Sequence, residues 1–92
     1  MNIDITSRGF TPSSDLIELI NTKVEKLSKF DKNISDIKVV LKKESRAEKV
    51  ELIVESKRNT YVSKRYSSAF EKTLVMSIDN IKSQIQKNKF NY

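Results

Sequence analysis

Apolar and polar residues alternate at the start of the chain, over residues 2–6. An alternation with a period of two is typical of a β-strand that buries one face. Beyond Gly9, the only glycine, apolar residues recur at spacings of three and four, the period of an amphipathic helix. Thr11 and Pro12 are residue types favoured at a helix N-cap and at the first helical position, so we expect a helix of about 18 residues to begin there. Its apolar stripe consists of Leu16, Ile17, Ile20, Val24, Leu27 and Phe30.

Three later segments have the residue pattern of strands. Residues 34–43 and 50–55 alternate between apolar and polar side chains, and the almost wholly charged residues 42–49 between them indicate the turn of a long hairpin. Residues 60–66 are rich in β-forming types and follow a polar turn at residues 57–59, but their pattern does not settle which face is buried. The predicted buried positions of the hairpin are Ile37, Val39, Leu41, Val50, Leu52 and Val54.

A second helix is predicted at the end of the chain. Ser68, followed three residues later by Glu71, has the spacing of a capping box. From there, apolar residues recur at helical spacing, and the pattern continues to about Lys89. The apolar stripe of this helix consists of Phe70, Leu74, Ile78, Ile81 and Ile85.

The order of these elements predicts an α+β fold with the sequence β-α-β-β-β-α. Each helix is apolar on one side only, so both are expected on one face of a single four-stranded sheet. The helical connection makes the first two strands parallel, and the short turns make the later strands antiparallel, which gives a mixed sheet. A chain of 92 residues hides only about 60–65% of its unfolded surface. We therefore expect one domain, residues 1–92, with its function on the surface rather than in a deep pocket.

The composition argues against most enzyme classes. The chain has no cysteine and no histidine, and a single glycine cannot build a phosphate-binding loop. Asp4, Asp36 and Asp79 are separate in the sequence, and isolated carboxylates are usually caps or ion-pair partners. Glu51 and Glu55 share a strand face, as is typical of the solvated side of an antiparallel sheet. We expect no catalytic residues, no metal site, no cofactor and no small-molecule substrate.

The start of the chain has no feature of a membrane or export segment. Asp4 and Arg8 interrupt the first ten residues, and no apolar run approaches the roughly 18 residues needed to span a membrane. The expected location is the cytoplasm.

Positive charge is concentrated in one part of the chain. Residues 1–55 hold ten Lys/Arg and ten Asp/Glu, and residues 56–92 hold eight against two, so the whole formal net charge of +6 arises in the second part. Such segregation creates a basic surface that attracts a polyanion, of which nucleic acid is the leading candidate. From charge alone, lysine-rich helices that are simply well solvated remain an equal alternative.

The candidate RNA contacts are cations that the helical periodicity or a turn places toward solvent. On the second helix, Lys72 and Lys87 lie opposite the apolar stripe, while Lys82 and Lys89 flank it. If the two helices lie side by side, their outer faces and the basic turn of Lys57, Arg58, Lys64 and Arg65 offer several phosphate contacts, and binding would be steeply salt-dependent. The full set is Lys23, Lys26, Lys29, Lys57, Arg58, Lys64, Arg65, Lys72, Lys82, Lys87 and Lys89.

Aromatic residues add little to this prediction. Tyr61, Tyr66, Phe90 and Tyr92 are the aromatics outside the expected core or at its margin. They have the ring that base stacking needs, but tyrosines in strands more often serve packing, and terminal residues are often unconstrained. We assign them no site role.

Several strings of residues, taken together, resemble one known family. They are Leu16, Glu18, Lys23, Lys26 and Leu27 in the first predicted helix, Ile34, Ile37 and residues 39–42 in the second predicted strand, and Ile78, Asp79, Gln84, Ile85, Lys87 and Lys89 in the last predicted helix. In order and spacing they are similar to the ribosome hibernation-promoting factor family, also called ribosome-associated inhibitor, over nearly the whole chain. Residues 69–75 depart from the family's Asp-Met-Tyr-Ala-Ala-Ile-Asp stretch, and Asn80 and Ser83 stand where basic residues are frequent.

The resemblance implies a fold similar to double-stranded RNA-binding domains, used to occupy the decoding channel of the small ribosomal subunit. Its helices would hold ribosomal RNA phosphates, exclude messenger and transfer RNA, and inhibit translation under stress or in stationary phase. Lys23, Lys26, Lys87 and Lys89 are the contacts that the family pattern and the helical geometry both indicate. The chain resembles a short form that lacks the C-terminal dimerisation domain of long members. A general duplex-RNA binder, a protein-interaction module that modulates transcription, and a second factor for ribosome dimerisation remain open.

Overall fold

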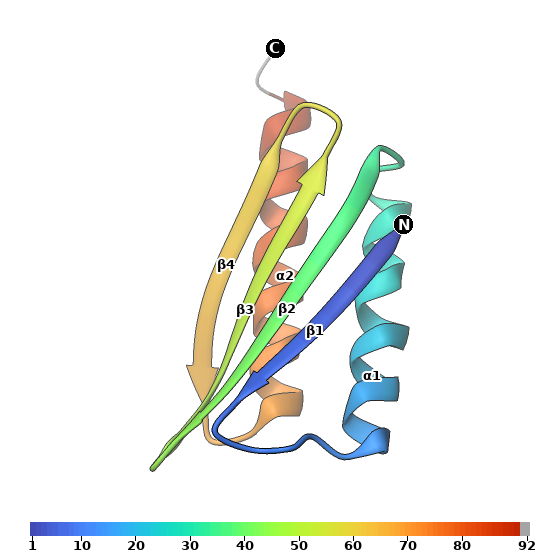
Figure 1. The fold of residues 1–92 in the computed structure, drawn as a ribbon. Coiled ribbons are helices and arrows are strands. Elements are labelled where there is room, and N and C mark those ends of the chain that lie inside the picture. Colours follow the sequence, from blue (N-terminus) through green and yellow to red (C-terminus); the bar gives the residue numbers. More distant parts are fainter. Residues whose placement is uncertain (91–92) are drawn as a thin grey trace.

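Four strands and two helices follow one another in the predicted order. The computed structural model describes the backbone of residues 1–90 and the side chains of residues 1–88. Both helices lie on one side of a single sheet, with α2 packed on β3 and β4 and α1 nearer β1 (Figure 1). The elements are β1 (Asn2–Arg8), α1 (Ser14–Glu25), the 3₁₀ turn η1 (Lys26–Lys29), β2 (Ile34–Glu44), β3 (Ala47–Ser56), β4 (Thr60–Ser67) and α2 (Phe70–Phe90).

The sheet has the strand order β1-β2-β3-β4 and is mixed, as predicted. β1 pairs with β2 in parallel, and the other two pairs are antiparallel. The register aligns Ile5, Val39, Leu52 and Ser63 in one row across the four strands. Directly paired residues point to the same face, so this row faces the helices and the rows on either side of it face solvent. The register also shifts between Ile34 and Asp36. In a regular strand, residues three positions apart point to opposite faces, and this shift explains why Ile34 and Ile37 are nevertheless both buried.

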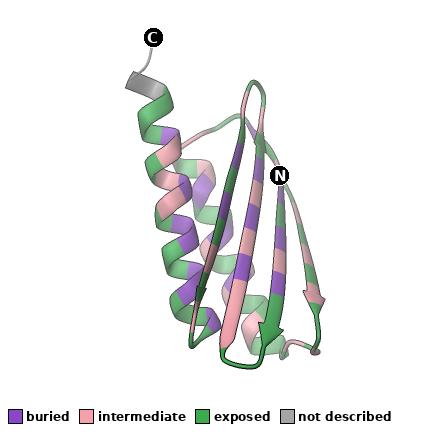
Figure 2. Ribbon diagram, turned by 90° about the vertical axis from the view of Figure 1, so that its left-hand side faces the viewer, coloured by how far each residue is buried: buried purple, intermediate pink, exposed green. Residues whose placement is uncertain are grey.

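The core lies between the helices and the sheet. Figure 2 shows the buried residues alternating along the strands and following the sides of the helices that face the sheet. The predicted stripe of α2 is buried throughout, as are the predicted hairpin positions. In α1 the prediction holds for Ile20, Val24 and Leu27, but Ile17 is exposed and lies outside the stripe. The connection after β1 also packs on the core, because the Phe10 ring stacks on Phe70 at a centroid distance of 4.9 Å.

The starts of both helices differ from the prediction. α1 begins at Ser14, and Ser13, rather than Thr11, is its N-cap: the Ser13 hydroxyl accepts a hydrogen bond from the backbone N–H of Leu16 at 3.1 Å. α2 begins at Phe70, whose N–H donates to the carboxylate of Glu48 on β3 at 2.8 Å. A side chain from the sheet therefore caps α2, in place of the capping box predicted at Ser68.

Candidate nucleic-acid interface

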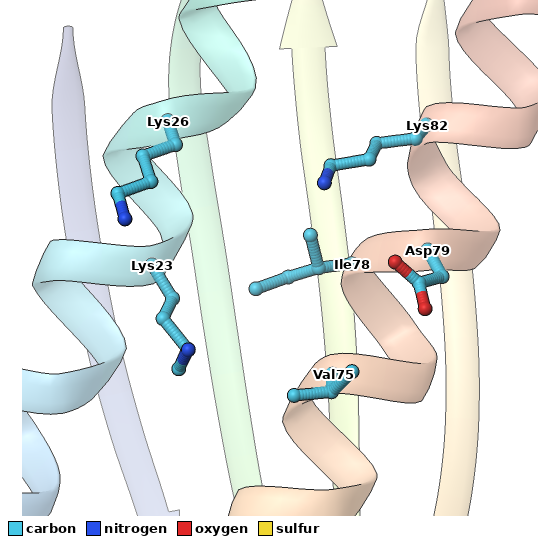
Figure 3. A pocket seen from close by; sticks show the side chains of 6 residues that line it. All are labelled: Lys23, Lys26, Val75, Ile78, Asp79 and Lys82. Atoms are coloured by element: carbon cyan, nitrogen blue, oxygen red, sulfur yellow. The ribbon is translucent and has the colours of Figure 1, made fainter.

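A shallow groove runs between α1 and α2 on the side of the molecule that faces away from the sheet (Figure 3). It encloses about 190 Å³. Pockets that bury small molecules usually measure about 300–1,000 Å³, so this groove suits a group held at the surface rather than an enclosed substrate. We call it the helix groove, and its lining consists of Lys23, Lys26, Val75, Ile78, Asp79 and Lys82.

Helical periodicity places these side chains. Lys23 and Lys26 are three residues apart and lie on one side of the first helical segment, while Val24 and Leu27 beside them are buried. On α2, Val75, Asp79 and Lys82 follow at spacings of four and three, which puts them on one stripe. Buried Ile78 and half-exposed Val75 form an apolar floor between the charged groups (Figure 3).

An aromatic ring positions Lys82. Its Nζ lies 4.9 Å from the centroid of the Phe30 ring, at the end of η1. The face of an aromatic ring attracts a cation, with a strength of about 0.5–1 kcal/mol at exposed sites. The contact joins α2 to the end of the first helical segment and holds the Lys82 ammonium over the groove.

Among the described side chains, no acid lies within ion-pair distance of the lysines of the helix groove. Among the side chains of residues 1–88, the ion pairs lie on the sheet: Lys42–Glu44, Lys43–Glu48, Lys49–Glu44 and Lys64–Glu51. Three lysines against Asp79 give the groove lining a formal charge of +2 (3 − 1). A cation that is not ion-paired is available to an external anion, so the groove can bind phosphate.

The remaining candidate cations are spread over other surfaces. Lys29, Lys72 and Lys87 are exposed on the helices but do not line the groove. Lys57 and Arg58 form the turn between β3 and β4, which lies beside the C-terminal half of α2 (Figure 1). The side chain of Lys89 lies outside the described residues, as do those of Phe90 and Tyr92.

Lys64 and Arg65 lie on opposite faces of the sheet. Lys64 lies on the solvent side of the sheet, opposite the helices, and its Nζ is 3.2 Å from the carboxylate of its cross-strand partner Glu51. Arg65 is half-buried on the helix side of β4 and donates from Nη1 to the Lys64 carbonyl at 2.9 Å. The expectation that Lys64 and Arg65 belong to one basic turn is wrong, because both lie within β4 and neighbours along a strand point to opposite faces.

The two strand tyrosines differ from each other. Tyr61 is buried, and its hydroxyl accepts a hydrogen bond from Asn88 Nδ2 at 3.3 Å, so its prediction as a packing residue is confirmed. Tyr66 is 68% exposed on the opposite side of the strand, so the same prediction is wrong for it. The pattern of β4 could not separate the two, because its buried positions include the polar residue Ser63.

Carboxylates that are distant in sequence meet at one end of the sheet. Asp4, Asp36 and Glu55 line a hollow on the solvent side of the sheet, next to Lys38. Within the described part of the chain, no group of three or more Asp, Glu, His or Cys side chains is arranged to hold a metal ion.

Neither helix, over the residues described, combines the length and the apolar character that a bilayer span requires.

Comparisons with known proteins agree with this architecture. The family model described as "Sigma 54 modulation protein / S30EA ribosomal protein" matches residues 3–91. A ribosomal subunit interface protein from Coxiella burnetii has a similar fold, with a TM-score of 0.91 and 23% identity over 99% of this chain and 100% of that chain. The N-terminal domain of Protein Y from Thermus thermophilus has a TM-score of 0.85 and 16% identity over 95% of this chain and 98% of that chain. A search of curated protein sequences gave no match.

Proposed function

The chain belongs to the Sigma 54 modulation protein / S30EA ribosomal protein family, and from this we propose that it is a ribosome-associated hibernation factor. In this proposal it binds RNA of the small ribosomal subunit in the decoding channel. Its bulk excludes messenger and transfer RNA, and translation stops without any reaction being catalysed. The setting we propose is the cytoplasm under stress or in stationary phase, with residues 1–92 acting as a single ribosome-binding domain.

The observation that carries the proposal is the helix groove. Lys23, Lys26 and Lys82 line one surface feature and have no acid within ion-pair distance among the described side chains. Ribosomal RNA carries one phosphate per nucleotide. One RNA chain can therefore contact the groove and the exposed lysines outside it at the same time. Binding of this kind releases counterions and weakens by roughly one power of the salt concentration for each phosphate neutralised.

Two further observations support a ribosomal target. The two structures named above match this chain over nearly their whole length, and one of them carries the name ribosomal subunit interface protein. The groove is shallow, with cations on both walls and no enclosed cavity for a small molecule. These features suit a polymeric anion that lies along the surface. Steric exclusion requires only that the protein occupies the channel, and a binding surface is sufficient for that.

The test is co-sedimentation of the purified protein with separated ribosomal subunits at two salt concentrations. We expect binding to small subunits, and a steep loss at the higher salt. Lys26→Gln should weaken binding and lower the salt slope by about one unit, as expected when one phosphate contact is removed. Lys38→Gln is the matched control, because it removes the same charge from an exposed lysine on the opposite side of the sheet.

Two results would overturn the proposal. One is the absence of small-subunit binding at low salt by a folded protein. The other is a partner that survives ribonuclease treatment, which would identify a protein target such as a component of the transcription machinery, the alternative that the family description also names.

A further inference from the structure

The sheet face opposite the helices, here called the open face, carries a cationic row at one end. The register aligns Arg8 on β1, Lys42 on β2, Lys49 on β3 and Tyr66 on β4. These four residues share the open face because the positions that alternate with them, such as Leu41 and Val50, are buried against the helices. We call them the hairpin-end row, since they lie next to the β2–β3 turn, which reaches beyond both helices (Figure 1).

The opposite end of the open face has the reverse charge. There the register aligns Asn2, Asp36, Glu55 and Thr60, with two acids and no cation. The four positions of the hairpin-end row hold three cations and no acid, and the one acid paired with them is the neighbouring Glu44. An extended polyanion is therefore attracted to the hairpin end and repelled from the other end, which fixes where on the face it lies.

Tyr66 supplies an exposed ring within this cationic row. It is 68% exposed, the highest fraction among the exposed large apolar side chains of the described residues. Its direct cross-strand partner is Lys49, so the two side chains are neighbours on the open face. An exposed aromatic beside cations is the combination with which proteins hold single-stranded nucleic acid, by stacking a base and neutralising its phosphates.

Glu44 holds two cations of the row in place. The Lys49 ammonium lies 2.8 Å from one carboxylate oxygen of Glu44, and the Lys42 ammonium lies 3.1 Å from the other. The three side chains are all exposed on the hairpin, so the ion pairs contribute little to the stability of the fold. They show that Lys49 and Lys42 reach one carboxylate together, so a phosphate that displaces Glu44 can meet both.

We propose that the hairpin-end row binds a single-stranded RNA segment, with one base stacked on Tyr66 and the adjoining phosphates held by Lys49, Lys42 and Arg8. A duplex does not fit this site as well, because its bases are stacked on one another and present no free face to the ring. The row crosses four strands, a width of about 14 Å at the usual strand spacing, so it accommodates a short segment. The site is separate from the helix groove, on the other side of the sheet, and it does not depend on the ribosomal proposal.

The experiment measures binding of the isolated protein to two fluorescein-labelled probes by anisotropy. One probe is a short oligoadenylate, and the other has the same length and phosphates but abasic positions in its centre. Tyr66→Ala should weaken binding of the oligoadenylate about 5- to 150-fold, the loss of one stacked base, and leave binding of the abasic probe unchanged. Tyr66→Phe, which keeps the ring, should bind both probes as the unmodified protein does.

Charge variants separate this site from the helix groove. Lys49→Gln should weaken both probes and reduce the salt slope by about 0.7, the value for one phosphate of a single strand. Glu44→Gln should tighten binding of both probes, because it releases Lys49 and Lys42 from a competing carboxylate. Lys26→Gln, in the helix groove, should weaken the oligoadenylate less than Lys49→Gln does.

Folding is controlled with Tyr66→Thr, which removes the ring but keeps a residue type that favours strands. It should have the thermal midpoint of the unmodified protein and the same selective loss of oligoadenylate binding as Tyr66→Ala. The proposal is overturned if the folded Tyr66 variants bind both probes unchanged, or lose both equally. It is also overturned if Lys26→Gln weakens the oligoadenylate while Lys49→Gln does not, because the probe would then occupy the helix groove.

Discussion

The ammonium of Lys82 on α2 lies 4.9 Å from the centre of the Phe30 ring, which follows η1. The two residues are far apart in the sequence, and their contact bridges the two sides of the helix groove. Phe30 is partly buried against the core, so its ring is fixed by packing and provides a rigid platform for a flexible lysine. A lysine restrained in this way loses less side-chain entropy when it binds a phosphate.

We predict that Phe30→Leu weakens ribosome binding about two- to fivefold, which corresponds to the roughly 0.5–1 kcal/mol of an exposed cation–π contact. Leucine keeps an apolar group against the core but has no ring face for Lys82. The measurement is small-subunit co-sedimentation at low salt. Phe30→Tyr keeps the ring and is the control. Equal binding by the leucine and tyrosine variants would show that the ring does not prepare Lys82 for binding.

We predict that Glu48→Gln lowers the free energy of unfolding by about 0.5–2 kcal/mol. The Glu48 carboxylate accepts the N–H of Phe70 at 2.8 Å and so combines a cap with a negative charge at the positive end of α2. Urea unfolding followed by circular dichroism measures the change. Glu51→Gln, which removes the exposed pair with Lys64, should cost at most about 1 kcal/mol. Equal losses from both variants would show that the negative charge of Glu48 adds nothing at the start of α2.

We predict that Gly9→Ala destabilises the fold by about 1–2 kcal/mol, the cost of a left-handed conformation in a residue with a side chain. Gly9 has a φ of +87°, and a Cβ at this position would lie 3.3 Å from the carbonyl oxygen of Lys43. Gly9→Asn should lose less, because asparagine tolerates this region of backbone conformation better. Thermal unfolding compares the two variants. An alanine variant as stable as the unmodified protein would show that the connection after β1 adopts another conformation.

We predict that Lys49→Met raises the pKa of Glu44 more than Lys42→Met does. Hydrogen bonds from Lys49 and then Lys42 hold the pKa of this carboxyl below its ordinary value. Since the folded-state pKa is the lowered one, the ion pairs contribute stability above the ordinary pKa of glutamate and lose it as the pH falls through the lowered value. NMR titration of the Glu44 side-chain carboxyl carbon measures the shift. No change in either variant would mean that the two ion pairs do not persist in solution.

The fold followed from periodicity wherever one face of an element is uniformly apolar. The hairpin and α2 were predicted on this basis, because residues such as Leu52 and Ile81 repeat at the period of the element that buries them. β4 could not be oriented in this way, since it buries Ser63 and exposes Val62 and Tyr66. Its faces are set by pairing with β3, which is a property of the sheet and not of the segment.

The helix starts show a second limit of local patterns. Ser13 and Thr11 are both suitable cap residues, and the choice between them depends on where the chain leaves the sheet. The cap of α2 comes from Glu48, 22 residues before Phe70 in the sequence, so no motif near the helix could reveal it. A contact between residues so far apart in the sequence depends on how the helices and strands pack against one another.

The candidate site was predictable residue by residue but not as a surface. Helical spacing showed that Lys23, Lys26 and Lys82 avoid the core, yet only the packing of α1 beside α2 makes them one groove. The same packing leaves Lys72 and Lys87 outside it. The hairpin-end row was missed for a related reason. Its members come from four strands, and only the register brings them together.

The central claim is tested most directly by competition on the small ribosomal subunit. Subunits are first loaded with messenger RNA and an initiator transfer RNA, and the protein is then added at low salt and sedimented with them. If the protein occupies the decoding channel, it should bind empty subunits and be excluded from loaded ones, and pre-bound protein should block loading. Equal binding to empty and loaded subunits would contradict the account, because the protein would then lie elsewhere on the ribosome.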